Sequence, residues 1–308
     1  MQKIIILLLA ILPLPVFSQA QKWKRNRKEY SIGFGATNFL GDLGGRNQIG
    51  TDGFMDFEIK ATRYAASLGY RYQLGRDWFV KGNLIYAKVS GADNLTEQTS
   101  RAARQLNFKS NIIELSAQIE YMLIKQKSGH LYKLRGVRGK SWFRFEVYAL
   151  AGIGGIWYDP KGDRNGTWHR LSPLNTEGQG LPGGPKDYSS ITAVIPYGLG
   201  IRRNLSGGAR SRHFGSWSIS LELTMRKTFS DYIDDVSTVY YDSKGTGALG
   251  AGYTDDALYF SDPSGRYING RYGEDQQRGD SSDKDAYMLG IISLNYKPAR
   301  RRRNLPKF

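Results

Sequence analysis

The clearest structural signal in the chain is the stretch Trp217-Ser218-Ile219-Ser220-Leu221-Glu222-Leu223-Thr224-Met225-Arg226. Large apolar side chains alternate strictly with polar ones along it. Successive side chains of a strand point to opposite faces, so the stretch predicts a strand with one apolar face and one polar, charged face. Its length suits a strand that crosses a bilayer at a tilt.

The same alternation recurs in seven further segments, which are separated by stretches rich in Gly, Asp and Asn. It is less regular in one of them, because Lys81 and Asn83 share a face with Phe79 and Ile85. An even number of strands places both termini on the same side. The eight predicted strands are Glu29–Leu40, Tyr64–Leu74, Trp78–Ser90, Asn111–Leu123, Trp142–Tyr158, Ile191–Arg203, Trp217–Arg226 and Ala286–Lys297.

Alternation of this kind is found both in secreted β-sandwiches and in membrane barrels. Three features favour the barrel: the polar faces carry full charges, short and long connections alternate, and aromatic residues lie near the ends of the apolar faces. The prediction is an all-β fold, an eight-stranded antiparallel transmembrane β-barrel with short periplasmic turns and long extracellular loops. The predicted aromatic girdle contains Tyr30, Tyr72, Trp78, Tyr121, Trp217 and Tyr296.

The N-terminus has the pattern of a secretory signal. A short basic start precedes the apolar run Ile4–Leu12, and small residues follow, with cleavage expected after Ser18 or Ala20. The apolar run is too short for a membrane-spanning helix. The expected organisation is a signal peptide (1–20), a basic periplasmic segment (21–28), an outer-membrane β-barrel (29–297) and a basic periplasmic tail (298–308). The expected location is the outer membrane of the cell.

The predicted lumen carries acids and bases together. Eight strands leave an interior that side chains fill, and buried charge is tolerated only when it is paired. We therefore expect a filled, ion-paired lumen and no open solute channel. The predicted network consists of Arg63, Arg71, Glu114, Glu120, Arg144, Glu146, Glu222 and Arg226.

The formal charge of +16 gathers on the side of the predicted periplasmic turns and tail. Export from the cytoplasm argues against nucleic acid as the partner. One interpretation is a rim that attracts anionic lipid headgroups. The other is a surface that docks an acidic periplasmic protein, because opposed charges speed and orient association. The docking residues would be Lys125, Lys127, Lys133, Arg135, Arg138, Lys140, Arg300, Arg301, Arg302 and Arg303.

The sequence predicts no enzyme and no cofactor. The chain has no Cys, so thiolate metal sites and Cys nucleophiles are excluded. His130, His169 and His213 lie in different connections, although a lipid hydrolase built on His169 and a serine is an alternative. Residues 245–250 match G-x-G-x-x-G in letters but lack the strand and helix that this motif requires.

The longest predicted outer loop is acidic. Its residues Asp231, Asp234 and Asp235 are close enough in sequence to bind Ca²⁺, but their spacing departs from the known calcium-loop signature. A solvated acidic turn is the simpler interpretation, and the calcium site stays open as an alternative.

Four motifs carry a resemblance to a known family. They are Gly35-Ala36-Thr37-Asn38-Phe39-Leu40-Gly41-Asp42-Leu43-Gly44-Gly45, the run from Arg226 to Asp242, Ile195-Pro196-Tyr197-Gly198 and Asn175-Thr176-Glu177-Gly178-Gln179-Gly180. The chain resembles small outer-membrane β-barrels of Bacteroidetes-type bacteria, a family that includes or lies close to PorG-like proteins of the type IX secretion system. The resemblance extends over most of the mature chain.

The resemblance implies a non-enzymatic barrel that anchors or assists a protein-transport machine. Its partners would be outer-membrane lipid and periplasmic or outer-membrane subunits of a secretion or envelope complex. The alternative is a stand-alone surface barrel whose long outer loops bind a ligand or another cell-surface protein.

Overall fold

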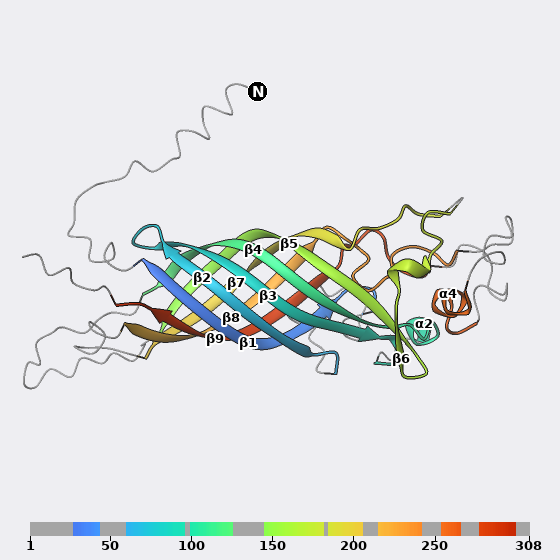
Figure 1. Cartoon of the computed structure of the whole chain (residues 1–308), viewed down its shortest axis with the longest axis horizontal. Helices are drawn as coiled ribbons and strands as arrows, with labels where there is room; N and C mark the ends of the chain where they lie inside the picture. The colour runs from blue at the N-terminus through green and yellow to red at the C-terminus, as the bar shows by residue number, and fades with distance from the viewer. Residues whose placement is uncertain are drawn as a thin grey trace, which may run out of the picture.

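The computed structural model describes residues 27–43, 60–95, 99–125, 145–181, 184–205, 215–241, 254–265 and 277–299. The end that carries the start of β1 and the end of β9 is called the inner end, and the opposite one the outer end (Figure 1). The strands are β1 (Lys28–Leu40), β2 (Arg63–Gln73), β3 (Trp78–Ala92), β4 (Asn107–Ile124), β5 (Glu146–Arg164), β6 (Thr167–Arg170), β7 (Ile191–Asn204), β8 (Ser216–Thr228) and β9 (Ala286–Lys297).

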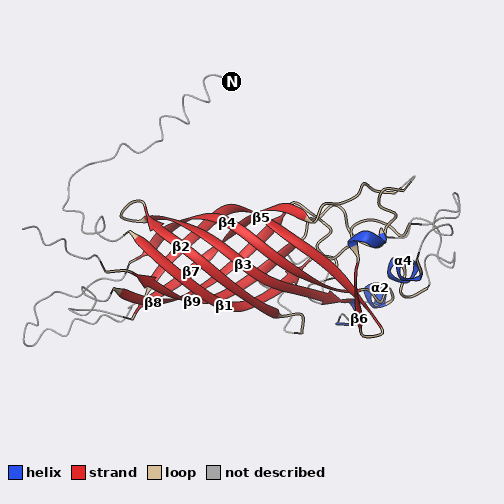
Figure 2. Cartoon of the chain, in the orientation of Figure 1, coloured by secondary structure: helices blue, strands red, loops and turns tan. Residues whose placement is uncertain are grey.

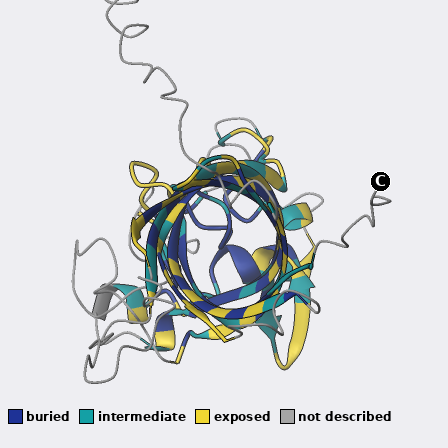
Figure 3. Cartoon of the chain, turned by 90° about the vertical axis from the view of Figure 1, so that its left-hand side faces the viewer, coloured by how far each residue is buried: buried dark blue, intermediate teal, exposed yellow. Residues whose placement is uncertain are grey.

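Eight of these strands close into a barrel. Each pairs antiparallel with its neighbours in the order β4-β3-β2-β1-β9-β8-β7-β5, and β5 pairs with β4 to complete the ring. The ring is visible end-on from the inner end (Figure 3), and its strands make up most of the described chain (Figure 2). The predicted eight-stranded antiparallel barrel is confirmed.

The alternation in the sequence separates the inside of the barrel from its outside. In β4, Glu114 and Glu120 are fully buried, whereas Leu115 between them is 69% exposed. Every strand of the ring presents large apolar side chains outward, and a continuous apolar exterior is stable only against lipid. The barrel therefore spans a membrane. One outward residue from each strand in chain order is Ile32, Leu68, Leu84, Leu115, Ile153, Leu199, Leu221 and Ile292.

Aromatic residues mark the inner boundary of this apolar exterior. Their rings pair across neighbouring strands at the inner end, where amphipathic Trp and Tyr side chains suit the boundary between lipid and water. The pairs and the distances between their ring centroids are Tyr30–Tyr70 (5.5 Å), Trp78–Tyr121 (4.6 Å) and Trp217–Tyr296 (4.6 Å).

The strands extend further at the outer end than the sequence pattern suggests. β5 continues to Arg164, and Asn165 and Gly166 then turn the chain into β6 with φ angles of 54° and 83°. Two successive positive φ angles match a type I′ hairpin turn, for which Asn-Gly is the preferred pair. The predicted loop after Tyr158 therefore begins as a hairpin, and the Asn-Gly pair was the signal for it.

The described helices are short and lie at the outer end. They are α2 (Thr99–Ala102), α4 (Asp255–Ser261), and the 3-10 turns η2 (Asp93–Leu95) and η3 (Ser172–Leu174). No helix in the described ranges is both long and apolar enough to cross a membrane.

The outer half of the barrel is filled by an apolar cluster. Phe39 and Phe108 meet edge to face within it, with 4.8 Å between ring centroids. Ile233 and Val236 come from the connection between β8 and β9, and both are buried in the same cluster. This connection therefore plugs the outer mouth with its own side chains.

Candidate functional site

Two ion pairs in the lumen join residues of the predicted network. Arg71 Nε lies 2.5 Å from Glu120 Oε2, and Arg226 Nε lies 3.1 Å from Glu114 Oε2. Tyr287 donates a further hydrogen bond to Glu114, with its hydroxyl 3.0 Å from Oε2. Both pairs are almost inaccessible to solvent, so each charge has the partner that burial requires.

Two further pairs were not predicted. Lys81 Nζ lies 2.6 Å from Glu222 Oε1, and Arg202 Nη2 lies 2.9 Å from Glu29 Oε1. The signal for Lys81 was present in the irregular alternation of Trp78–Ser90, because the face that it shares with Phe79 is the lumen face. Arg202 lies near the end of the predicted strand Ile191–Arg203, and alternation along β7 places it on the buried face.

Two predicted members, Arg63 and Glu146, form no lumen ion pair among the described residues. Arg63 is a correction: it has the inward parity but lies at the outer end of β2, where its exposed Nη1 donates to the carbonyl oxygens of Lys60 and Thr62. Glu146 lies at the inner rim, where its Oε1 accepts from Asn204 Nδ2 at 3.3 Å. Arg144 lies outside the described residues.

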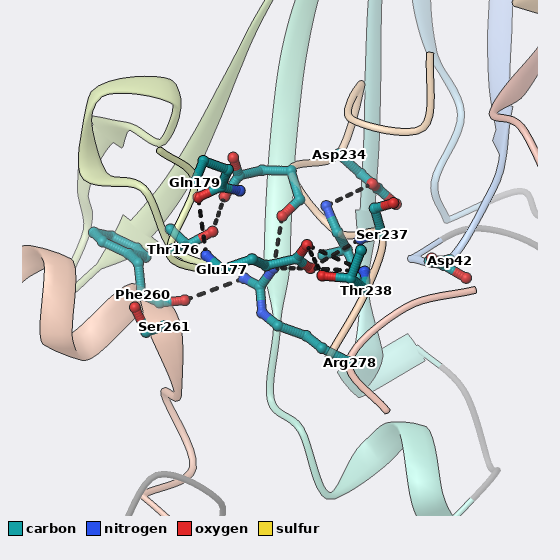
Figure 4. A network of polar contacts seen from close by, with 12 residues as sticks. Asp42, Thr176, Glu177, Gln179, Asp234, Ser237, Thr238, Phe260, Ser261 and Arg278 are labelled. Carbon is teal, nitrogen blue, oxygen red and sulfur yellow. Dashed lines mark hydrogen bonds and ion pairs between the residues drawn. The ribbon is translucent and has the colours of Figure 1, made fainter. Parts of the chain in front are cut away.

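A buried cap closes the outer end (Figure 4). Glu177 and Arg278 form its centre, with 2.8 Å between Oε1 and Nη1. Glu177 also accepts hydrogen bonds from the backbone N–H groups of Ser237 and Thr238 and from the Thr238 hydroxyl. Arg278 donates to the carbonyl oxygen of Phe260 at 3.3 Å. One buried ion pair thus joins segments from the β6–β7 and β8–β9 connections.

Asp231, Asp234 and Asp235 of the β8–β9 connection are buried rather than solvated, which corrects the simpler sequence interpretation. The carboxylate of Asp234 accepts from the N–H groups of Leu43 and Val236, and that of Asp285 accepts from Ile233 N at 2.8 Å. Backbone donors therefore hold these carboxylates and fix the connection across the barrel mouth.

Burial changes the acidity of this region. It raises the pKa of Asp231 to about 7, an effect that the nearby Asp42 carboxylate adds to and the Ser237 hydroxyl opposes. Burial likewise raises the pKa of Asp42 to about 6. Among the described residues, no group of three or more acids, histidines or cysteines is placed to hold a metal ion. The alternative of a calcium site at Asp231, Asp234 and Asp235 thus gains no support.

His169 lies in β6, and its environment is that of a structural contact. Its Nδ1 is 3.0 Å from Asp256 Oδ2, and Arg164 Nη1 is 2.6 Å from Oδ1 of the same carboxylate. The shared carboxylate ties the β5–β6 hairpin to α4. His130, His213 and residues 245–250 lie outside the described residues.

The inner end is the location of the predicted docking residues. Lys125 follows β4 and forms an ion pair with Asp77 of the β2–β3 turn. The remaining predicted docking residues, together with the predicted signal peptide, lie outside the described chain. They are Lys127, Lys133, Arg135, Arg138, Lys140 and Arg300 to Arg303.

Comparison with known proteins gives matches among solved structures alone. No protein family model matches the chain, and no curated protein matches its sequence. Among solved structures, Ail of Yersinia pestis is 10% identical, with 89% of this chain and 99% of that chain covered and a TM-score of 0.36. Neisserial surface protein A is 9% identical (88% and 96% covered, TM-score 0.37). The outer membrane protein OprG from Pseudomonas aeruginosa is 11% identical (90% and 98% covered, TM-score 0.33).

Proposed function

We propose that this chain is a non-enzymatic outer-membrane β-barrel that serves as an anchor or accessory subunit of an envelope machine, the type IX protein secretion system. Closed antiparallel barrels with an apolar exterior and aromatic borders are the architecture of outer-membrane proteins. The secretion role is supported by the sequence motifs shared with PorG-like barrels. Two of these motifs, Gly35–Gly45 and Arg226–Asp242, contribute Phe39, Ile233 and Val236 to the plug.

The observation that carries the proposal is the filled lumen. Its inner half contains the ion pairs of Arg71 and Lys81, and its outer half contains the apolar cluster around Ile233. A barrel of this size filled with paired charges and apolar side chains does not conduct solutes. A binding function therefore belongs to the two ends of the barrel.

The inner end is the proposed contact with periplasmic partners. The charge excess of the sequence gathers on the connections and tail at this end. An acidic partner would be steered toward such a surface, with a faster association rate at low salt.

The test is co-purification of periplasmic partners with variants of the tail. Changing Arg300–Arg303 to Gln leaves every strand intact, so barrel assembly should be unchanged while partner recovery per membrane-inserted barrel falls. Changing the same residues to Glu should lower recovery further. If the tail instead serves lipid contact or insertion, less barrel will assemble, but recovery per assembled barrel will stay at the wild-type level.

The segments beyond the outer end of the ring favour a second candidate, a surface barrel that binds another molecule with its outer loops. The β5–β6 hairpin and α4 project beyond the ring of strands (Figure 1). Trp168 on the hairpin is 40% exposed. Lys109 Nζ lies 3.4 Å from the centroid of the Trp168 indole. Unchanged partner recovery with both tail variants would favour this candidate.

A further inference from the structure

The inner mouth of the barrel contains a cavity of about 590 Å³. Its lining comes from the inner ends of the strands and from the β2–β3 turn, so the cavity opens inside the ring seen in Figure 3. Phe79 and Met122 supply apolar surface, and Arg71, the partner of Glu120, is also part of the lining. The volume falls in the range of sites for small molecules and peptide side chains.

Basic side chains dominate this cavity. Its lining contains five bases against two acids, Glu29 and Glu146. Lys125 is paired with Asp77, and Arg71 and Arg202 both lie beside Glu29. Within the described part of the chain no ion pair involves the two remaining bases, Arg76 and Lys297. The cavity therefore keeps positive charge after its internal pairs are counted.

Two guanidinium groups in the lining have unused donors. Arg71 is 3% exposed and Arg202 is 4% exposed, yet Arg71 Nη2 and Arg202 Nε have no hydrogen-bond acceptor among the described residues. A buried donor without an acceptor costs free energy, most of all when it belongs to a charged group. Both donor atoms are shielded from solvent, so an incoming carboxylate oxygen would supply an acceptor once these guanidinium groups turn toward the cavity, and charge-assisted hydrogen bonds of this type are strong.

We propose that this cavity binds an acidic side chain of a polypeptide segment that enters the inner mouth of the barrel. The volume exceeds that of a bare carboxylate, and the walls combine bases with Phe79 and Met122, so they suit a carboxylate carried on an apolar stem. Lipid headgroups lie outside the ring of strands, whereas the cavity lies inside it. The inference rests on the proposed docking function, because the segment belongs to the periplasmic partner.

The direct test is calorimetric titration of the refolded mature chain in detergent micelles. The probe is the capped peptide acetyl-Gly-Glu-Leu-Glu-Gly-amide, and the matched control has Gln in place of both Glu. We expect saturable binding of one acidic peptide per barrel, weakened by salt, and binding of the Gln peptide that is at least about tenfold weaker. Equal binding of the two peptides would overturn the proposal.

Variants locate the site. The double change Arg76→Gln with Lys297→Gln spares every described ion pair of the lumen and should weaken binding of the acidic peptide about tenfold. The control double change, Lys161→Gln with Lys227→Gln, removes the same formal charge at the outer end and should leave binding unchanged. Equal weakening by both pairs would mean nonspecific attraction to a basic protein and would sink the cavity site.

Two further measurements separate the alternatives. Displacement of the peptide by inorganic phosphate at equal concentration would show a site for any oxyanion, which contradicts the peptide proposal. Peptide binding in a barrel that recovers no periplasmic partner would refute the docking function and leave the cavity site standing. Partner recovery by a barrel that binds no acidic peptide would refute the cavity site alone.

Discussion

Lys81 and Glu222 meet across the lumen, with 2.6 Å between Nζ and Oε1. Lys81 belongs to β3 and Glu222 to β8, and three strands separate β3 from β8 in either direction around the ring. The Tyr148 hydroxyl donates to the same oxygen at 2.7 Å. Ladder hydrogen bonds connect only neighbouring strands. This pair therefore braces β3 against β8 and helps to set the cross-section of the barrel.

The first prediction concerns this brace. Lys81→Met should lower the free energy of unfolding by about 3–5 kcal/mol, because Glu222 is left buried without its cation. Urea unfolding of the barrel refolded into vesicles measures the change. The double variant Lys81→Met with Glu222→Leu should recover much of the loss, since no lone charge remains. A double variant less stable than the single one would contradict the brace.

The second prediction concerns the apolar exterior. Leu221→Arg or Leu115→Arg should cost about 2–4 kcal/mol, because each places a cation at mid-depth in the bilayer. The matched control is Leu74→Arg, at an exposed leucine in the inner turn, which should cost about 0–1 kcal/mol. The same unfolding assay applies. Similar costs at all three positions would mean that the lipid-facing surface is wrongly assigned.

The third prediction concerns the packing of Tyr148. A Cβ atom at Gly200 would lie 2.3 Å from the Tyr148 ring, whereas one at Gly82 meets nothing within 4 Å. Gly200→Ala should therefore destabilise the barrel by about 1–3 kcal/mol through overpacking. Gly82→Ala, on the outer face, is the control and should be close to neutral. Equal stability of the two variants in thermal unfolding would show that the Tyr148 side chain moves freely to make room.

The fourth prediction concerns pH. The folded-state pKa of Asp231, about 7, lies above the ordinary value of 3.8, so protonation stabilises the folded connection. This stabilisation is complete below 3.8 and is lost as the pH rises through 7. Proteolysis of the outer connection should thus be slower at pH 5.5 than at pH 8. The rates are corrected for the pH dependence of the protease itself, measured on an unstructured peptide substrate. Asp231→Asn should flatten the profile. An unchanged profile in this variant would exclude Asp231 as its source.

The fifth prediction concerns conduction. The filled lumen should give no sustained conductance in a planar bilayer, under conditions where a porin reconstituted at the same protein-to-lipid ratio conducts. A steady open level in the unmodified protein would contradict the closed interior. The measurement also separates the docking proposal from a transport function.

The sequence predicted the strands well because period-two alternation is a local property. From Trp217 to Thr224 the exposure of each residue follows from its parity alone, whereas Met225 is buried against its parity. It also predicted that Arg71 and Glu120 face the lumen. It did not identify the pairing of Lys81 with Glu222, because contacts across the ring depend on how all the strands are staggered. Nor did it predict Arg202 as the partner of Glu29.

The outer cap could not be predicted for a different reason. Composition makes an Asp-rich connection look solvated, yet Asp285 and Asp234 are buried because backbone N–H groups at Ile233 and Leu43 donate to them. Such donors become available only after distant segments have been positioned by the barrel. Loop composition therefore gave the wrong environment for the residues that close the outer mouth.

The pairing of β1 with β9 has a consequence for biogenesis. Tyr30 lies opposite Tyr296 in this seam, and Leu40 lies opposite Ala286, so the first and last strands of the chain complete each other's hydrogen bonding. Hydrocarbon does not tolerate an unpaired strand edge. A nascent chain that lacks β9 would leave both β1 and β8 with open edges. Insertion must therefore wait until synthesis of the whole chain has finished, and the protein has to cross the periplasm as an unassembled polypeptide.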